Sequence, residues 1–135
     1  MAMKKILIAD DDVQMVSALR TLLENVGFAV TVTHHSKEVV ELSRREKPDL
    51  ILLDVLFAGM PGPDGFEVSR KIAKDAELRS TPVIILSGVK RVIASDFTVE
   101  PDEEWLPVAA FLDKPVRPDQ LLKEIERLLS DRSHS

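Results

Sequence analysis

The chain has 135 residues, of which 44% are hydrophobic and 30% charged. It is therefore long enough for one domain with a buried core, and its composition is not that of a disordered protein. The net charge of −5 disfavours direct binding to nucleic acid, because phosphate groups attract basic surfaces. The absence of cysteine excludes disulfides and thiolate metal sites and is compatible with the cytoplasmic location that we expect. No apolar run approaches the roughly 20 residues that span a bilayer, and the N-terminus lacks the pattern of a signal peptide, so we expect no association with membranes.

The first third of the chain predicts two strands separated by a helix. Residues 5–9 predict a buried strand, because Lys5 is followed by the apolar run 6–9. Apolar residues then recur at helical spacing over residues 16–26, and Gly27 is placed to end that helix. Residues 28–33 alternate and are rich in β-branched side chains, as a second strand would be.

The middle of the chain continues the alternation. Ser36 can cap a second helix, which Pro48 breaks. Residues 50–53 form an apolar run that predicts a third strand. Residues 58–65 carry too many glycines and prolines for a helix and predict a loop.

The last part predicts two more strands and two more helices. Residues 66–73 are expected to be helical, residues 82–86 and 110–113 to be strands, and Pro118 to open a final amphipathic helix. Short, continuously apolar strands separated by helices indicate a parallel sheet covered on both faces. We therefore predict a flavodoxin-like, doubly wound α/β fold with five strands in the order 2-1-3-4-5. Residues 1–130 would form one domain and residues 131–135 a flexible tail.

Acidic side chains follow three of the predicted strands. Asp10-Asp11-Asp12 follow the first strand, Asp54 closes the third, and Asp113 precedes Lys114 at the end of the fifth. The C-terminal ends of parallel strands line one edge of such a sheet, so several of these groups should meet there. Clustered carboxylates cannot all stay ionised unless a cation or a proton compensates them. A hard divalent cation with oxygen ligands, above all Mg²⁺, fits this requirement.

The chain resembles the receiver domain of bacterial response regulators in the residues that follow four of its strands: Asp10-Asp11, Asp54, Ser87 and Lys114-Pro115. The resemblance runs over nearly the whole chain. It implies that Asp54 accepts a phosphoryl group from a histidine kinase or a phosphotransfer protein. It also implies that Asp11 binds Mg²⁺ directly, that Asp10 assists through water or hydrogen bonds, and that Asp54 and the main-chain carbonyl of Leu56 are further ligands.

The resemblance assigns roles to three more residues. Ser87 would donate a hydrogen bond to a phosphoryl oxygen, Lys114 would pair with another, and Phe111 would be the aromatic residue that moves inward on phosphorylation. A carboxylate can attack phosphorus only when the negative charge of the phosphoryl group is neutralised on approach, so a metal ion, a hydroxyl and an ammonium group suit this chemistry. The family also leads us to expect a cis Lys114–Pro115 bond.

Each residue has a simpler interpretation when it is taken alone. An aspartate after a strand is usually a turn residue or a helix cap, and we prefer the cap for Asp12. Alone, Lys114 would be a solvated surface residue and Ser87 a helix cap. The three histidines lack the spacing of a metal site, and we interpret them as surface residues: His34, His35 and His134.

Two segments depart from the family pattern. Residues 58–63 contain a short insertion after Asp54, which we take as a tolerated loop extension rather than a docking device. Residues 89–108 are long and poor in helical pattern, so the family's fourth helix should be shortened or atypical, with Trp105 packing in its place or anchoring a partner. Leu56 and Val89 are apolar at the positions that influence hydrolysis in the family, which predicts slow loss of the phosphoryl group.

The sequence thus predicts a stand-alone receiver that is not an enzyme acting on a metabolite. It would catalyse only its own phosphorylation and dephosphorylation, and would signal to an unidentified protein target through a phosphorylation-dependent surface. The alternative is a small phosphohydrolase resembling the haloacid dehalogenases, in which Asp10 would be the nucleophile and Asp54 would have no role. A degenerate receiver that binds partners without phosphorylation is a third possibility.

Overall fold

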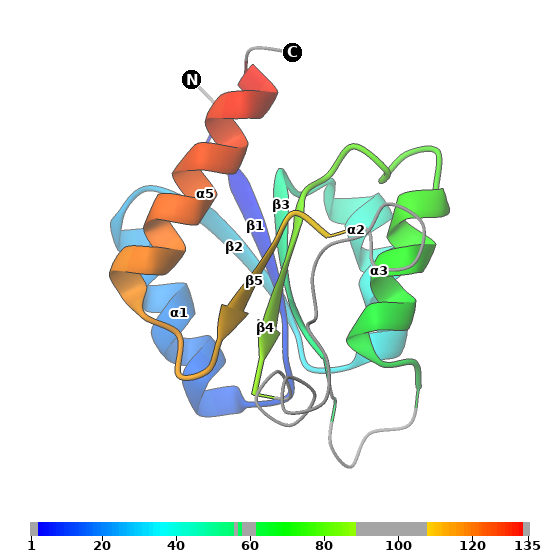
Figure 1. Ribbon diagram of the computed structural model, residues 1–135, viewed down its shortest axis with the longest axis horizontal. Coiled ribbons are helices and arrows are strands. Elements are labelled where there is room, and N and C mark those ends of the chain that lie inside the picture. The colour runs from blue at the N-terminus through cyan, green and yellow to red at the C-terminus, as the bar shows by residue number, and fades with distance from the viewer. Residues whose placement is uncertain (1–2, 56, 58–61, 89–107, 134–135) are drawn as a thin grey trace, which may run out of the picture.

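The computed structural model describes residues 3–55, 57, 62–88 and 108–133. Its strands are β1 (Lys5–Ala9), β2 (Ala29–Thr33), β3 (Leu50–Asp54), β4 (Val83–Ser87) and β5 (Ala110–Asp113). Its helical segments are α1 (Val13–Asn25), the 3₁₀ helix η1 (Ser36–Glu38), α2 (Val39–Glu46), α3 (Gly65–Lys74) and α5 (Pro118–Ser133). The strands form one sheet in the order β2-β1-β3-β4-β5, and all neighbouring pairs are parallel (Figure 1). The predicted fold class and strand order are confirmed.

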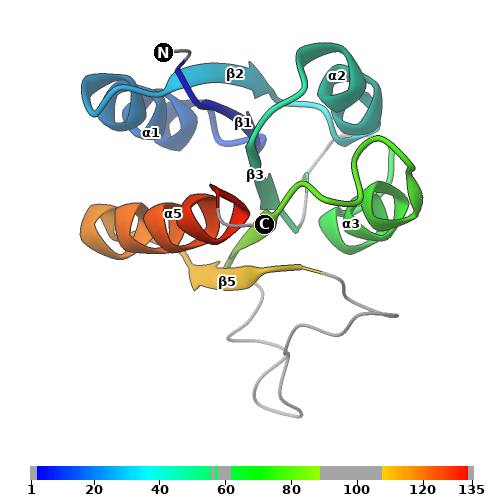
Figure 2. The same ribbon diagram turned by 90° about the horizontal axis from the view of Figure 1, so that it is seen from above.

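The sheet separates two hydrophobic cores. Helices α1 and α5 cover one face, and α2 and α3 cover the other (Figure 2). Because side chains alternate along a strand, Ile6 and Ile8 face the first core while Leu7 and Ala9 face the second. All four are fully buried, which explains why β1 is apolar from Ile6 to Ala9 instead of alternating with polar residues.

The ends of the helices follow local sequence signals. The N–H of Gly27 donates to the carbonyl of Glu24 at 3.1 Å, and that of Phe28 donates to Leu23 at 3.0 Å. With Gly27 at φ +103°, these bonds form a Schellman motif, so the predicted role of Gly27 in ending α1 is confirmed. Asp12 caps α1 by accepting from the N–H of Met15 at 3.0 Å, as predicted.

The second helix begins differently from the prediction. Ser36 does not cap it but lies within η1, which precedes α2. The extended residue that a cap requires is His35, at φ −124° and ψ 119°. The Ser36 hydroxyl is buried and has no hydrogen-bond partner among the described residues. The prediction was therefore wrong: the helical segment η1–α2 begins at Ser36, directly after the extended His35, and the residue before α2 itself is Glu38.

Several predictions fall outside the described residues. They concern Leu56, the insertion at 58–63 apart from its last two residues, and the segment 89–108 apart from Val108. At the C-terminus, α5 continues to Ser133, three residues beyond the predicted domain boundary. None of the helices in the described ranges is long and apolar enough to cross a membrane.

Candidate functional site

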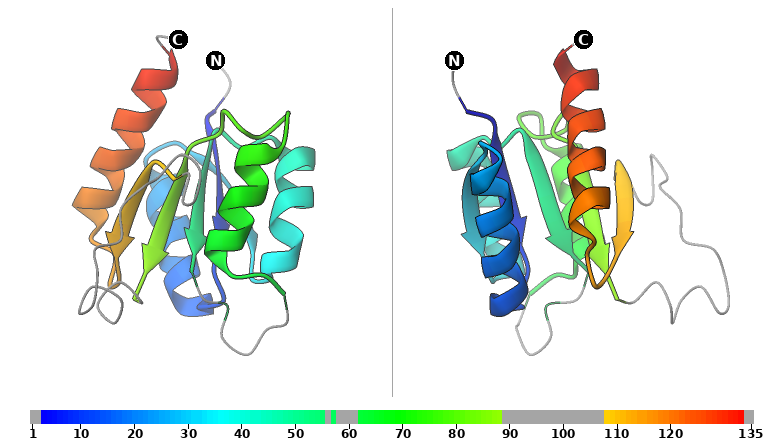
Figure 3. Two further views of the ribbon diagram at one scale, coloured as in Figure 1. Left: turned by 45° about the vertical axis from the view of Figure 1, so that its right-hand side comes forward. Right: turned by 90° about the vertical axis from the view of Figure 1, so that its left-hand side faces the viewer.

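The C-terminal ends of the strands gather at one edge of the sheet (Figure 3). Ala9 at the end of β1 pairs with Leu53 of β3, which places Asp10 beside Asp54. Ser87 of β4 pairs with Asp113 of β5, so Lys114 leaves the sheet at the same edge. The strand order therefore assembles the site.

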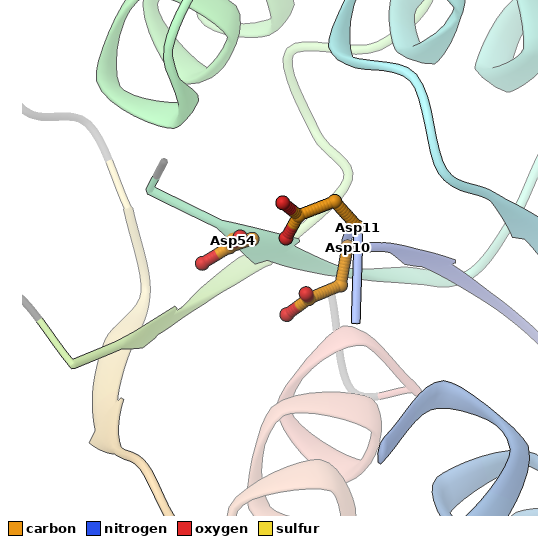
Figure 4. Close-up of side chains that lie close together, drawn as sticks. All are labelled: Asp10, Asp11 and Asp54. Atoms are coloured by element: carbon orange, nitrogen blue, oxygen red, sulfur yellow. The ribbon is translucent and has the colours of Figure 1, made fainter. Parts of the chain in front are cut away.

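Three carboxylates meet at this edge. One carboxylate oxygen each from Asp10, Asp11 and Asp54 lies within 4.8 Å of the others, and the side chains point to the same side in Figure 4. Asp10 and Asp54 are only 0% and 4% exposed, whereas Asp11 is partly exposed. Asp113 is exposed and does not belong to this cluster. Of the acids that the sequence placed at strand ends, these three come together.

Lys114 links the two buried carboxylates. Its Nζ lies 2.9 Å from Oδ2 of Asp10 and donates a hydrogen bond to Oδ1 of Asp54 at 3.0 Å. Its main-chain N–H donates to the carbonyl of Ser87 at 3.1 Å, and the Lys114–Pro115 bond is cis, as expected. Lys114 is thus part of the site and not a solvated surface residue.

Burial controls the electrostatics of the cluster. Loss of solvent, and then the charge of Asp10, raises the pKa of Asp54 to about 7. Burial also raises the pKa of Asp10. Burial alone would lower the pKa of Lys114, but its hydrogen bonds and charge interactions with Asp10 and Asp54 outweigh that effect and raise it. The lysine therefore remains an ammonium ion, while protonation of the buried carboxyls competes with cation binding.

The cluster fits a hard divalent cation. When all groups are ionised, the carboxylates of Asp10, Asp11 and Asp54 carry −3 and Lys114 carries +1, which leaves −2. Oδ2 of Asp54 is buried and has no hydrogen-bond partner within the described part of the chain. Carboxylate oxygens are the ligands that Mg²⁺ prefers, so the donor set, the surplus charge and this unpaired oxygen agree with the predicted cation.

Two more predicted residues lie close by in the fold. Ser87 ends β4, next to the strand that carries Asp54, and is 4% exposed. Phe111 is partly buried and packs against the core between the sheet and α2–α3. Both positions are compatible with their predicted roles, which stay predictions.

Gly65 allows the first turn of α3 to approach the end of β3, the strand that carries Asp54. A Cβ at this position would overlap the carbonyl oxygen of Asp54 and would lie 2.9 Å from Cα of Val55. The N–H of Gly65 donates to the carbonyl of Val55 at 2.7 Å. Glycine is therefore required for the close packing behind Asp54.

Sequence analysis missed one residue near the site. His34 was interpreted as a surface residue, but it is partly buried, and its Nδ1 lies 2.8 Å from the carbonyl oxygen of Asp10. No spacing rule could have found this contact, because it depends on how the chain leaves β2.

Comparison with known proteins identifies the family. The family described as "Response regulator receiver domain" matches residues 6–126. The chain belongs to this family. Receiver domains are phosphoacceptor modules of two-component signalling, and the family implies interaction with histidine kinases or phosphotransfer proteins.

Individual receiver proteins align over almost their full length. Protein PilH of Pseudomonas aeruginosa is 35% identical over 131 residues, covering 95% of this chain and 99% of PilH. The polar-differentiation response regulator DivK of Brucella anthropi is 29% identical, with 95% and 98% covered. The crystal structure of a CheY-like receiver domain protein from Methanospirillum hungatei JF-1 has a TM-score of 0.80 at 26% identity, with 98% of each chain covered.

The phosphohydrolase alternative finds no support in these comparisons. Asp54, for which that alternative had no role, forms an ion pair with the same lysine as its expected nucleophile, Asp10.

Proposed function

We propose that Asp54 is the phosphoacceptor of this receiver domain and that it takes its phosphoryl group from a phosphohistidine of a kinase or phosphotransfer protein in the cytoplasm. The observation that supports this most directly is the ammonium group of Lys114, which lies within 3.0 Å of both Asp54 and Asp10. A buried carboxylate beside a cation and two further acids is suited to receive an anionic group with a divalent counter-ion.

Each residue of the site would have its own role in the phosphoryl transfer. An oxygen of Asp54 attacks phosphorus, the P–N bond of the donor breaks, and the imidazole keeps the electron pair and takes a proton from solvent. Lys114 pairs with one phosphoryl oxygen, and the hydroxyl of Ser87 donates to another. Asp10, Asp11, Asp54 and the carbonyl of Leu56 would hold Mg²⁺, which when bound neutralises negative charge on the phosphoryl group.

Phosphorylation would then change a binding surface. Ser87, which is buried, would turn toward the new phosphoryl group, and the partly buried Phe111 would move inward in response. The surface near β5 would change shape, and an unidentified protein target would recognise it. This coupling accounts for a signalling output without any activity toward a metabolite.

A groove beside the site supports docking of the phosphodonor. It has a volume of about 550 Å³ and is largely apolar. It lies between α1 and the segment after β5, and its lining includes Met15, Leu19, Leu22, Lys114, Pro115 and Val116. Since Lys114 both lines the groove and contacts Asp54, a donor helix seated there would place its histidine near the acceptor.

The test is phosphorylation by a small acyl phosphate in the presence of Mg²⁺, followed by intact mass and peptide mapping. The wild-type protein should gain the mass of one phosphoryl group on Asp54. Asp54→Asn should abolish the gain, whereas Asp12→Asn should retain it, because Asp12 caps α1. A phosphoryl group on Asp10, or one that persists in Asp54→Asn, would contradict the proposal.

A further inference from the structure

The hydrogen-bond ladder between β1 and β2 breaks at Asp10. The N–H of Asp10 donates to the carbonyl of Thr33 at 3.1 Å, as the parallel ladder requires. In a parallel ladder the next bond would join the N–H of His35 to the carbonyl of Asp10. The N–H of His35 donates instead to the hydroxyl of Thr33 at 3.2 Å. Thr33 is 4% exposed, so this local bond lies inside the fold and diverts the chain.

The ring of His34 replaces the missing donor. Its Nδ1 lies 2.8 Å from the carbonyl oxygen of Asp10. A carbonyl oxygen can only accept, so Nδ1 must carry the hydrogen. A side chain thus completes the last bond of the ladder, at the residue where the chain turns from the sheet into the acidic cluster.

The carbonyl group of Asp10 bears directly on the geometry of the cluster. The carbonyl of Asp10 and the N–H of Asp11 belong to one planar peptide group, so fixing the first also fixes the plane from which Asp11 projects. The other polar contacts of Asp10 at this turn are made by its carboxylate. Oδ1 accepts from the N–H of Asp12 at 2.9 Å, and Oδ2 faces Lys114. These bonds do not involve the main-chain carbonyl of Asp10, which is the group that His34 contacts.

We infer that His34 is a positioning residue of the phosphoacceptor site: it holds the peptide plane between Asp10 and Asp11, and thereby the direction of the Asp11 carboxylate. The inference rests on the proposed function of the same site. His34 acts through Asp10 and Asp11 and touches neither phosphorus nor the cation, so its effect should resemble that of outer-shell partners in metal sites, whose loss weakens metal binding by about 10- to 100-fold.

Three variants separate positioning from simple packing. His34→Phe keeps a ring of similar size but removes the donor. His34→Asn places an amide nitrogen where Nδ1 was and should restore the bond. His35→Phe is the matched control, because His35 is also partly buried and no described residue hydrogen-bonds to its ring. Each protein is stripped of metal and titrated with MgCl₂ by calorimetry, at a temperature where circular dichroism shows it to be folded.

We expect His34→Phe to weaken Mg²⁺ binding by about tenfold or more, with His34→Asn within about threefold of wild type. Nitrogen NMR of the metal-free wild type should show the hydrogen of His34 on Nδ1. If His34→Phe lowers stability but leaves the Mg²⁺ affinity of the folded protein unchanged, or if the hydrogen is on Nε2, the inference is overturned. If the wild type itself neither binds Mg²⁺ nor is phosphorylated on Asp54, the proposed function fails and this inference fails with it.

Discussion

Replacing Asp54 with asparagine should stabilise the metal-free protein at neutral and alkaline pH. Burial, and then the charge of Asp10, raises the pKa of Asp54 from 3.8 to about 7. A carboxyl group with a raised pKa binds its proton more tightly in the folded chain, so its ionised form lowers the free energy of unfolding. The difference between the two pKa values corresponds to roughly 4 kcal/mol. This destabilisation is absent below about pH 4, grows toward pH 7 and is complete above it.

The assay is urea unfolding followed by circular dichroism in EDTA across this pH range. Asparagine keeps the shape of the side chain and can still accept from Lys114, so we expect a gain of about 2 to 4 kcal/mol at about pH 8 that disappears near pH 4. Asp12→Asn is the control, because it removes the same charge from an exposed helix cap that asparagine fills equally well. A variant no more stable than wild type at about pH 8, or a gain independent of pH, would refute the reasoning.

Three further predictions follow from the site. Mg²⁺ binding should weaken by about tenfold for each pH unit below about 7, because the cation competes with the proton on Asp54; a flat calorimetric profile over this range would contradict it. Gly65→Ala should lower the free energy of unfolding by about 1 to 3 kcal/mol in thermal denaturation, because its Cβ would overlap the carbonyl of Asp54. Gly88→Ala is the control, because its Cβ would meet no atom within 4 Å among the described residues beyond its chain neighbours; an equal loss there would exclude this explanation. Leu56→Asn should accelerate decay of the phosphorylated form, measured by intact mass, because an amide can orient the attacking water; an unchanged rate would remove the argument from apolar residues.

The sheet and most of the site could be predicted because both follow from short-range patterns and topology. All five residues of Leu50–Asp54 are buried, and a strand covered on both faces must be apolar throughout. Once the strands are parallel, their C-terminal ends share one edge, so Asp10, Asp54 and Lys114 had to approach one another. The cap at Asp12 was predictable for the same reason, since its bond to Met15 spans only three residues.

Two features near β2 could not be predicted because they depend on which acceptor the N–H of His35 takes: the hydroxyl of Thr33 two residues away, or the carbonyl of Asp10 on the neighbouring strand. The hydroxyl of Thr33 accepts from His35 and donates to Glu38 at 2.8 Å. These two bonds keep His35 extended, so the helical segment begins at Ser36. The carbonyl of Asp10 then accepts a hydrogen bond from the ring of His34. A sequence pattern shows which residues are polar. It does not show whether the N–H of His35 or the ring of His34 will donate to the carbonyl of Asp10. The error at Ser36 and the missed contact of His34 have the same origin.

The destabilisation of the metal-free fold and the proposed capacity for phosphorylation both depend on the buried carboxylates of the cluster. A single ammonium group serves two buried carboxylates, and the third acid leaves a surplus of two negative charges when all are ionised. Loss of solvent around the buried carboxylates, and then this surplus charge, weaken folding without a cation. The surplus charge is also the reason that a divalent cation should bind. Any substitution that removes the negative charge of Asp54 should therefore stabilise the metal-free protein and also abolish phosphorylation. A substitution that removes only a positioning contact, such as His34→Phe, should weaken Mg²⁺ binding without the pH-dependent gain in stability.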